Sequence, residues 1–167
     1  MYSYKEFPEQ VELEMQIFAE ENNFELIEKE EDHCVRYRNR VWELYFFCDH
    51  GAVELSLINL NDGYEYSLYD ILELWFPDSY YSKKMNENIW GSLETIKFNA
   101  EALNNHYSEI SHNYNTDKER LTEYKRRSHV LINFVMSKGS DKLKNEFTLS
   151  SDKWIELASN EYIKSKN

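Results

Sequence analysis

The 167-residue chain has little glycine, proline and cysteine: four glycines, two prolines and two cysteines. This composition excludes collagen-like, linker-rich and low-complexity chains. Four scattered glycines cannot build a glycine-rich phosphate loop, and no nucleotide-binding, zinc-protease or hydrolase motif occurs. Two cysteines do not make a disulfide framework. The sequence therefore predicts no bound cofactor and contains no recognisable enzyme motif.

Long apolar runs are also absent. The longest surrounds Tyr45-Phe46-Phe47, far short of the ~18 apolar residues that a membrane span requires. The N-terminus lacks the apolar core of a secretory signal, so we expect a soluble cytoplasmic protein without membrane contact. Apolar residues nevertheless make up 41% of the chain and aromatics 16%, which is enough for a packed core and argues against disorder. The length predicts a single domain, residues 1–167.

Basic charge is scarce in the first half of the chain. The net charge is −12, yet residues 1–80 carry 19 acidic and 5 basic side chains, whereas residues 81–167 carry 12 acidic and 14 basic ones. The acidic balance disfavours direct binding to nucleic acid or anionic lipid. It predicts a surface complementary to a basic protein partner, with a simply solvated face as the alternative.

The hydrophobic periodicity predicts an α+β fold. Spacings of three and four predict an N-terminal helix from about Phe7 to Asn22, and alternation between Phe24 and Leu60 predicts a four-stranded antiparallel meander. Ser67 and Asp70 form a capping box for a helix that ends before Pro77, and residues 77–86 are predicted to form a loop. Strands precede helices, which is typical of α+β and not of a parallel α/β sheet.

The clearest helical signal is a seven-residue repeat, which predicts a mainly helical C-terminal half. Its apolar stripe comprises Ile89, Leu93, Ile96, Ala100, Leu103, Tyr107, Ile110 and Tyr114. Thr116 and Glu119 form a second capping box, and the next helix ends near Lys138. The short break predicts a long antiparallel helical hairpin. Its stripe would be an internal seam or, alternatively, a homodimer interface. A last helix is predicted from Ser151, and residues 140–150 receive no assignment.

Two groups of side chains are candidates for chemical sites. His33, Cys34, Cys48 and His50 bracket one hairpin and are zinc-ligand types. A two-residue Asn39-Arg40 loop would pair Cys34 with Tyr45 and place the cysteines on opposite faces, although a bulge would reverse this. The alternative to a metal site is a core or strand cysteine beside loop histidines, and no metal site is predicted. Glu123, Arg126 and His129 share a helix face and suit acid–base cleavage of RNA. A solvated polar face is the alternative there, and no catalytic residue is predicted.

Tyrosine is abundant, with 13 residues. Tyrosine and tryptophan are favoured as interface anchors, so we expect part of the set near the end of the sheet on a binding surface: Tyr64, Tyr66, Tyr69, Tyr80 and Tyr81. Combined with the acidic residues of the strands, the predicted partner-binding residues are Glu28, Glu30, Glu31, Asp32, Glu54, Tyr64, Glu65 and Tyr66.

Five runs carry a resemblance to a known group: Phe24–Glu28, Cys34–Tyr37, Val41–Phe47, Gly51–Leu57 and Tyr66–Leu72. Together they resemble small bacterial immunity proteins encoded beside polymorphic or secreted toxins. In that group a helix, an antiparallel sheet and a trailing helix recur, and acidic surfaces bind basic nuclease domains. The resemblance implies a cytoplasmic protein that neutralises a cognate toxin by occlusion. The alternatives are a nucleic-acid-mimicking regulator or anti-defence protein that binds a basic protein, and a metal-dependent enzyme or RNase.

Overall fold

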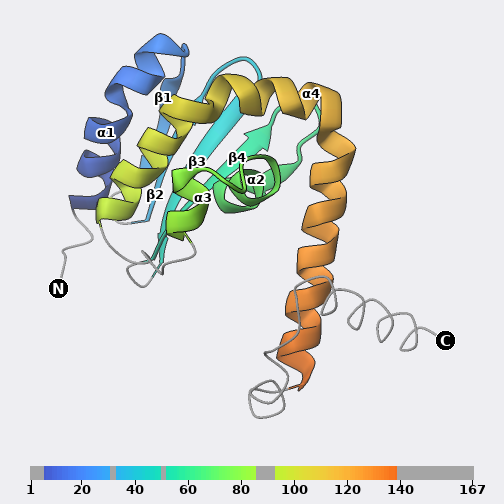
Figure 1. The fold of residues 1–167 in the computed structure, drawn as a ribbon. Coiled ribbons are helices and arrows are strands. Elements are labelled where there is room, and N and C mark those ends of the chain that lie inside the picture. Colours follow the sequence, from blue (N-terminus) through green and yellow to red (C-terminus); the bar gives the residue numbers. More distant parts are fainter. Residues whose placement is uncertain (1–5, 31–32, 50–51, 86–92, 139–167) are drawn as a thin grey trace. The chain divides into compact units, whose positions relative to one another are not determined.

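The computed structural model describes residues 6–30, 33–49, 52–85 and 93–138. The chain forms two compact units, Met1–Thr116 and Asp117–Asn167, so the structural division falls after the predicted charge boundary at residue 80. The fold is α+β, as predicted (Figure 1). Its elements are α1 (Phe7–Glu21), β1 (Glu25–Glu30), β2 (Cys34–Arg38), β3 (Trp42–Asp49), β4 (Ala52–Asn59), β5 (Glu65–Ser67), α2 (Leu68–Trp75), α3 (Tyr80–Met85) and α4 (Leu93–Lys138).

The five strands form one antiparallel sheet in sequence order, β1-β2-β3-β4-β5. Strands β1 to β4 confirm the predicted meander. Strand β5 was missed because three residues are too few to show alternation. It follows a tight turn in which Gly63 has a φ of +72°, and the backbone N–H of Tyr64 donates to Asp62 Oδ1 at 3.1 Å. The Asn59 N–H donates to the Tyr64 carbonyl at 2.9 Å, which returns the chain to β4.

The β2–β3 pairing differs from the predicted register. Cys34 pairs with Phe47, not with Tyr45. The displacement is two residues, an even number, so it does not move any side chain to the other face. The prediction that Cys34 and Cys48 occupy opposite faces of the sheet is therefore confirmed.

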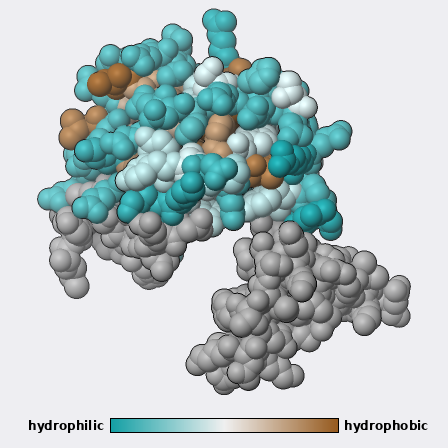
Figure 2. Space-filling view, in the orientation of Figure 1, coloured by the Kyte–Doolittle hydropathy of each residue, from teal (hydrophilic) through white to brown (hydrophobic). Residues whose placement is uncertain are grey.

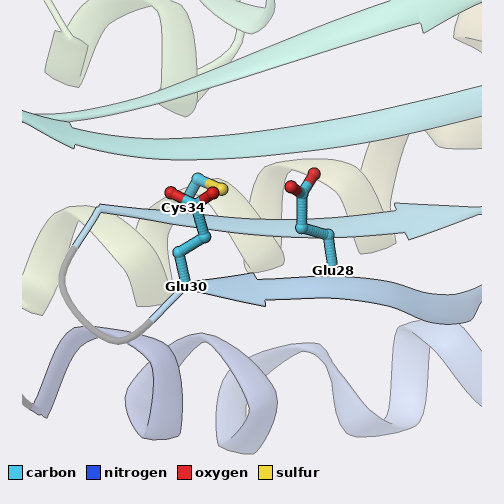
Figure 3. A group of neighbouring side chains, drawn as sticks. All are labelled: Glu28, Glu30 and Cys34. Atoms are coloured by element: carbon cyan, nitrogen blue, oxygen red, sulfur yellow. The ribbon is translucent and has the colours of Figure 1, made fainter.

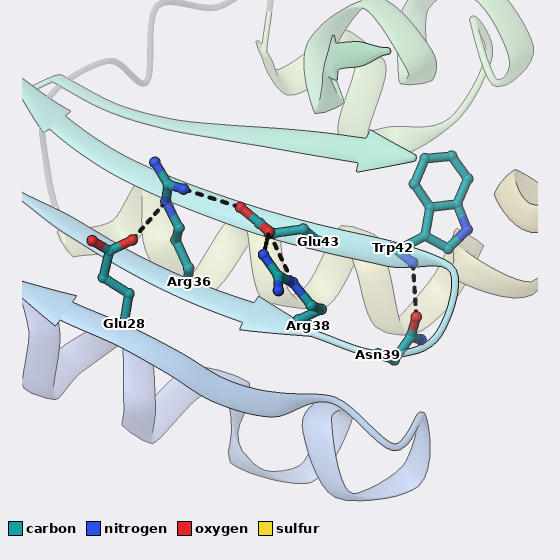
Figure 4. A network of polar contacts seen from close by, with 6 residues as sticks. All are labelled: Glu28, Arg36, Arg38, Asn39, Trp42 and Glu43. Carbon is teal, nitrogen blue, oxygen red and sulfur yellow. Dashed lines mark hydrogen bonds and ion pairs between the residues drawn. The ribbon is translucent and has the colours of Figure 1, made fainter. Parts of the chain in front are cut away.

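Asn39 explains the shifted register. Its N–H donates to the Trp42 carbonyl at 2.9 Å, so the loop consists of Arg40 and Val41 and not of Asn39 and Arg40. The Asn39 side-chain oxygen accepts from the N–H groups of Val41 at 2.9 Å and Trp42 at 2.8 Å (Figure 4). This Asx-type turn fixes the two-residue loop one position later in the sequence than predicted.

Helices cover one face of the sheet in the first unit (Figure 1). The predicted α1 stripe of Phe7, Val11, Met15 and Phe18 is buried, as are Trp42, Leu44, Phe46 and Cys48 on β3. Fully burying a large apolar side chain contributes about 1.5–3 kcal/mol, so this layer provides most of the stability of the unit.

The seven-residue repeat of α4 forms an internal seam with α1 and the sheet. Ile96, Ala100, Leu103, Ile110 and Tyr114 are buried. The Tyr107 ring lies 5.2 Å from the ring of Phe18, and the Tyr114 ring lies 4.7 Å from that of Trp42. Ile89 lies outside the described residues.

One helical prediction needs correction and another is confirmed. Residues 80–85, predicted as loop, form α3, because Ser79 caps it: the Ser79 Oγ accepts from the Ser82 N–H at 3.1 Å. The predicted break near Thr116 is confirmed, because α4 comprises two helical segments that meet at a kink at Asp117, where the backbone is non-helical (φ −141°, ψ 28°). The antiparallel arrangement of the two segments stays a prediction. The predicted last helix and residues 140–150 lie outside the described residues.

None of the described helices combines the length and the apolar character needed to cross a membrane.

Candidate functional site

The face of the sheet opposite the helices, here called the open face, carries most of the strand charge. Among the described residues of the first unit, no helix crosses in front of the strands when the sheet is viewed from this face (Figure 3). Strand pairing places on this face Glu25, Glu28, Glu30, Cys34, Arg36, Arg38, Glu43, Tyr45, Phe47, Asp49, Ala52, Glu54, Ser56, Ile58, Glu65 and Ser67. Seven carboxylates stand against two guanidinium groups, a net charge of −5.

The open face has an apolar centre and an acidic margin. Tyr45, Phe47 and Ile58 are half-buried in its middle, and the Tyr45 and Phe47 ring centroids lie 5.8 Å apart. The exposed carboxylates surround this centre: Glu25, Glu30, Asp49, Glu54 and Glu65. Aromatic centres with polar rims are the usual anatomy of protein–protein interfaces.

A buried carboxylate organises the middle of the open face. The Glu43 side chain is 5% exposed, and its Oε2 accepts from Arg38 Nε at 3.0 Å and Arg38 Nη2 at 2.5 Å. Its Oε1 accepts from Arg36 Nη1 at 3.2 Å (Figure 4). A buried charge must be paired and hydrogen-bonded to be tolerated, and both arginines fulfil this requirement here.

Arg36 connects Glu43 with the aromatic centre and with β1. Its guanidinium carbon lies 4.3 Å from the Tyr45 ring centroid, in a cation–π arrangement. Its Nε lies 3.0 Å from Glu28 Oε2, which is an ion-pair distance. The buried Nε makes no hydrogen bond within the described residues, so the contact with Glu28 is electrostatic. Both cations of the open face are thus engaged with carboxylates, and the exposed margin is left acidic.

Three potential metal ligands converge at the β1–β2 end of the open face (Figure 3). One ligand atom each from Glu28, Glu30 and Cys34 lies within 4.8 Å of the other two. Burial, followed by the charges of Glu28 and Glu30, raises the pKa of the Cys34 thiol. The thiol is therefore protonated at neutral pH.

The predicted partner-binding residues divide into three groups. Glu28, Glu30, Glu54 and Glu65 lie together on the open face, and Tyr64 is 48% exposed just before β5. Tyr66 is fully buried on the helix-covered face, where its ring lies 5.8 Å from that of Tyr114. It therefore offers no surface to a partner. Glu31 and Asp32 lie outside the described residues.

The structure separates the zinc-ligand types that bracket the hairpin. Cys48 is buried on the helix-covered face, opposite Cys34. His33 is exposed in the β1–β2 connection, and His50 lies outside the described residues. The four residues therefore do not form one site through their cysteines.

The helical candidate for acid–base chemistry contains a charged cluster. Glu123 accepts from Arg126 Nε at 2.7 Å and Arg127 Nε at 2.8 Å. These hydrogen bonds lower the pKa of Glu123 to about 2, which makes it a poor proton acceptor at neutral pH. The side chain of His129 is outside the described part of α4.

The other predicted surface tyrosines lie away from the open face. Tyr80 is 61% exposed on α3. Tyr81 packs its ring 5.3 Å from Phe98 and accepts a hydrogen bond from Asn105 Nδ2 at 2.7 Å. Tyr69 is half-buried in the first turn of α2. Tyr80 and Tyr81 join α3 to α4 through the Phe98 ring, and none of the three tyrosines lies on the open face.

A groove of about 770 Å³ lies at the end of β1 and β2. Its lining includes Asn23, Glu25, Arg38 and Arg40. Arg40 is exposed and has no ion-pair partner among the residues described. Mixed charges line this groove, so it selects no single class of ligand.

Among the residues that the structure describes, the helix-covered side shows no comparable surface. Figure 2 shows it as mostly hydrophilic, with hydrophobic residues in small, separate patches. Scattered apolar residues of this kind are normal on soluble proteins and do not mark an interface.

The Arg36–Glu43–Arg38 network was not predicted from the sequence. Two arginines two residues apart on one strand face the same side, and a glutamate on the next strand would meet them if the register were known. Because the assumed loop placed Arg36 opposite Glu43 without identifying Arg38 as a partner, the network stayed hidden.

Comparisons with family models, with curated proteins and with solved structures found no match to this chain.

Proposed function

We propose that this chain is a protein-binding module whose open face binds a basic protein domain. The most specific form of this proposal is a cytoplasmic bacterial immunity protein that covers the active surface of a cognate toxin. The observation that carries the proposal is the gathering of Glu28, Glu30, Glu54 and Glu65 on one uncovered sheet face with a net charge of −5.

The open face suits tight association for physical reasons. Its carboxylates would attract a basic domain over several ångströms and accelerate encounter. The half-buried centre of Tyr45, Phe47 and Ile58 would then supply apolar contact at low entropy cost. The strands hold these side chains in place, so little conformational entropy is lost on binding.

Charge reversal tests the proposal directly. The double variant Glu54→Lys/Glu65→Lys changes two exposed rim positions, and Glu109→Lys on the exposed side of α4 changes a charge away from the face. The protein would be co-expressed with the product of the neighbouring gene, and the association rate would be measured at several salt concentrations. We expect the double variant to slow association on the order of tenfold at low salt and to weaken protection, while Glu109→Lys changes neither.

The proposal fails if the neighbouring gene product neither binds nor is neutralised. It also fails if Glu109→Lys weakens binding as strongly as the double variant, because the effect would then be one of net charge. A partner that is a DNA- or RNA-binding protein without toxic activity would favour a nucleic-acid mimic over an immunity protein.

A further inference from the structure

Glu28, Glu30 and Cys34 are brought together by strand pairing, not by sequence proximity. Glu30 and Cys34 are direct partners across β1 and β2, and Glu28 lies two residues before Glu30 on the same face. Figure 3 shows both carboxylates and the thiol directed toward a common point on the open face. All three ligand atoms lie within 4.8 Å of one another.

The thiol distinguishes this group from an ordinary cluster of surface carboxylates. Cys34 is 5% exposed, and within the described residues no side chain hydrogen-bonds to its sulfur; the Glu30 backbone is its hydrogen-bonding contact. Arg36 pairs with the Glu28 carboxylate, whereas within the described residues no cation pairs with Glu30. A divalent cation at the common point would bond to the sulfur and supply positive charge to both carboxylates.

We infer that Glu28, Glu30 and Cys34 bind a divalent transition metal ion, with Zn²⁺ as the best-suited species. This inference does not rest on the proposed function. A sulfur ligand selects Zn²⁺ or Co²⁺ over Mg²⁺ and Ca²⁺, which prefer oxygen ligands alone. Three protein ligands leave the fourth tetrahedral position for water.

The distances are compatible with coordination after a small adjustment. Zn–S and Zn–O bonds of about 2.3 and 2.0 Å place sulfur and oxygen about 3.5 Å apart in a tetrahedral centre. The present limit of 4.8 Å therefore requires side-chain movements of roughly 1 Å. Glu30 is exposed and free to rotate, whereas Cys34 is held by its strand.

Arg36 supports the site as a positioning residue. Its Nε lies 3.0 Å from Glu28 Oε2, which leaves the other Glu28 oxygen for the metal. Outer partners of this kind orient a ligating carboxylate. Binding would replace the Cys34 S–H bond by a metal–sulfur bond, and the released proton would pass to the buffer.

The test uses the full-length, tag-free protein, treated with chelator and kept reduced. Co²⁺ is titrated while the near-ultraviolet thiolate-to-cobalt charge-transfer absorption is recorded, and bound Zn²⁺ is quantified by elemental analysis. We expect one equivalent of metal and a charge-transfer band. Loss of one ligand should weaken binding by on the order of 100-fold, because loss of an outer partner alone costs 10–100-fold.

Matched variants make the result decisive. Cys34→Ala should abolish the charge-transfer band, whereas Cys48→Ala, equally buried at 5% exposure on the opposite face, should retain it. Glu30→Gln should weaken binding without a folding penalty because the residue is exposed. Glu54→Gln should have no effect. Absence of binding in the unmodified protein, or a band that survives Cys34→Ala, overturns the inference.

Discussion

The buried carboxylate of Glu43 provides the sharpest test of how the open face is built. Glu43→Gln keeps the shape of the side chain but removes its charge and turns one acceptor oxygen into an NH₂ group. That NH₂ would face guanidinium N–H donors, because Arg36 and Arg38 donate to both carboxylate oxygens. The substitution should therefore destabilise the folded protein.

The size of the effect follows from the exposure of the partners. A hydrogen bond to a charged group contributes about 1.5–3 kcal/mol net when it is buried. The Arg38 side chain is 49% exposed, so water replaces its lost hydrogen bonds and their loss costs little stability. The Arg36 side chain is only 34% exposed, so the loss of its hydrogen bond costs more. We expect a loss of about 1–3 kcal/mol in the free energy of unfolding, well below the 3–5 kcal/mol of a fully buried pair.

Urea unfolding followed by circular dichroism measures this loss. Thermal unfolding provides a second measurement, since for a chain of this length a loss of 1 kcal/mol lowers the melting temperature by roughly 2–4 °C. Glu54→Gln is the matched control, because it removes an exposed glutamate from the same face, and it should change stability by less than about 0.5 kcal/mol.

A double-mutant cycle separates the Arg36–Glu43 pair from general effects of substitution. Arg36→Met/Glu43→Met should cost less than the sum of the two single changes, since neither charge is then left without its partner. An additive double variant, or a Glu43→Gln variant as stable as the unmodified protein, would refute the reasoning that the network stabilises the face.

Three further predictions concern the helical layer and its junctions with the sheet. Tyr114→Phe removes the hydroxyl that donates to the Asp62 carboxylate at 2.8 Å but keeps the ring contacts, and urea unfolding should show a loss of about 1–2 kcal/mol. Ser67→Ala removes the cap that accepts from the Tyr69 N–H at 3.1 Å and should cost about 1 kcal/mol by the same assay. Burial raises the pKa of Tyr37 from 10.0 to about 12, so its contribution to stability is complete below pH 10 and is lost as the pH rises through 12. Unfolding measured at pH 8, 10 and 12 should therefore show a decline in stability of which Tyr37 accounts for about 2 kcal/mol by pH 12, and that share should be absent in Tyr37→Phe. An equal decline in both proteins would contradict that assignment.

The sequence was most informative where the signal for a helix or strand lies within that element itself. The α1 stripe, the alternation of β1 to β4, the Ser67 cap and the α4 repeat are local signals, since period and capping chemistry depend on residues a few positions apart. The break near Thr116 was also visible, at the residue beside the non-helical Asp117. Whether the chain reverses there is not a local property, and the antiparallel hairpin stays a prediction.

The candidate site depended on information that no single segment contains. Alternation divides the side chains of each strand into two groups that point to opposite faces. Only the pairing of the five strands decides which group of each strand lies on the open face. The Asn39 side chain moved the β2–β3 register by two residues and thereby placed Arg38 beside Glu43.

By itself the sequence determined the α+β class, the order of its main elements and the concentration of negative charge in the first half, because composition and periodicity are properties of the chain alone. Tertiary structure decided that Glu28, Glu30, Glu54 and Glu65 share one uncovered face, that Tyr66 is buried, and that Cys34 meets two carboxylates. The physical reason is that hydrogen-bonded register, not sequence distance, sets which side chains are neighbours across a sheet.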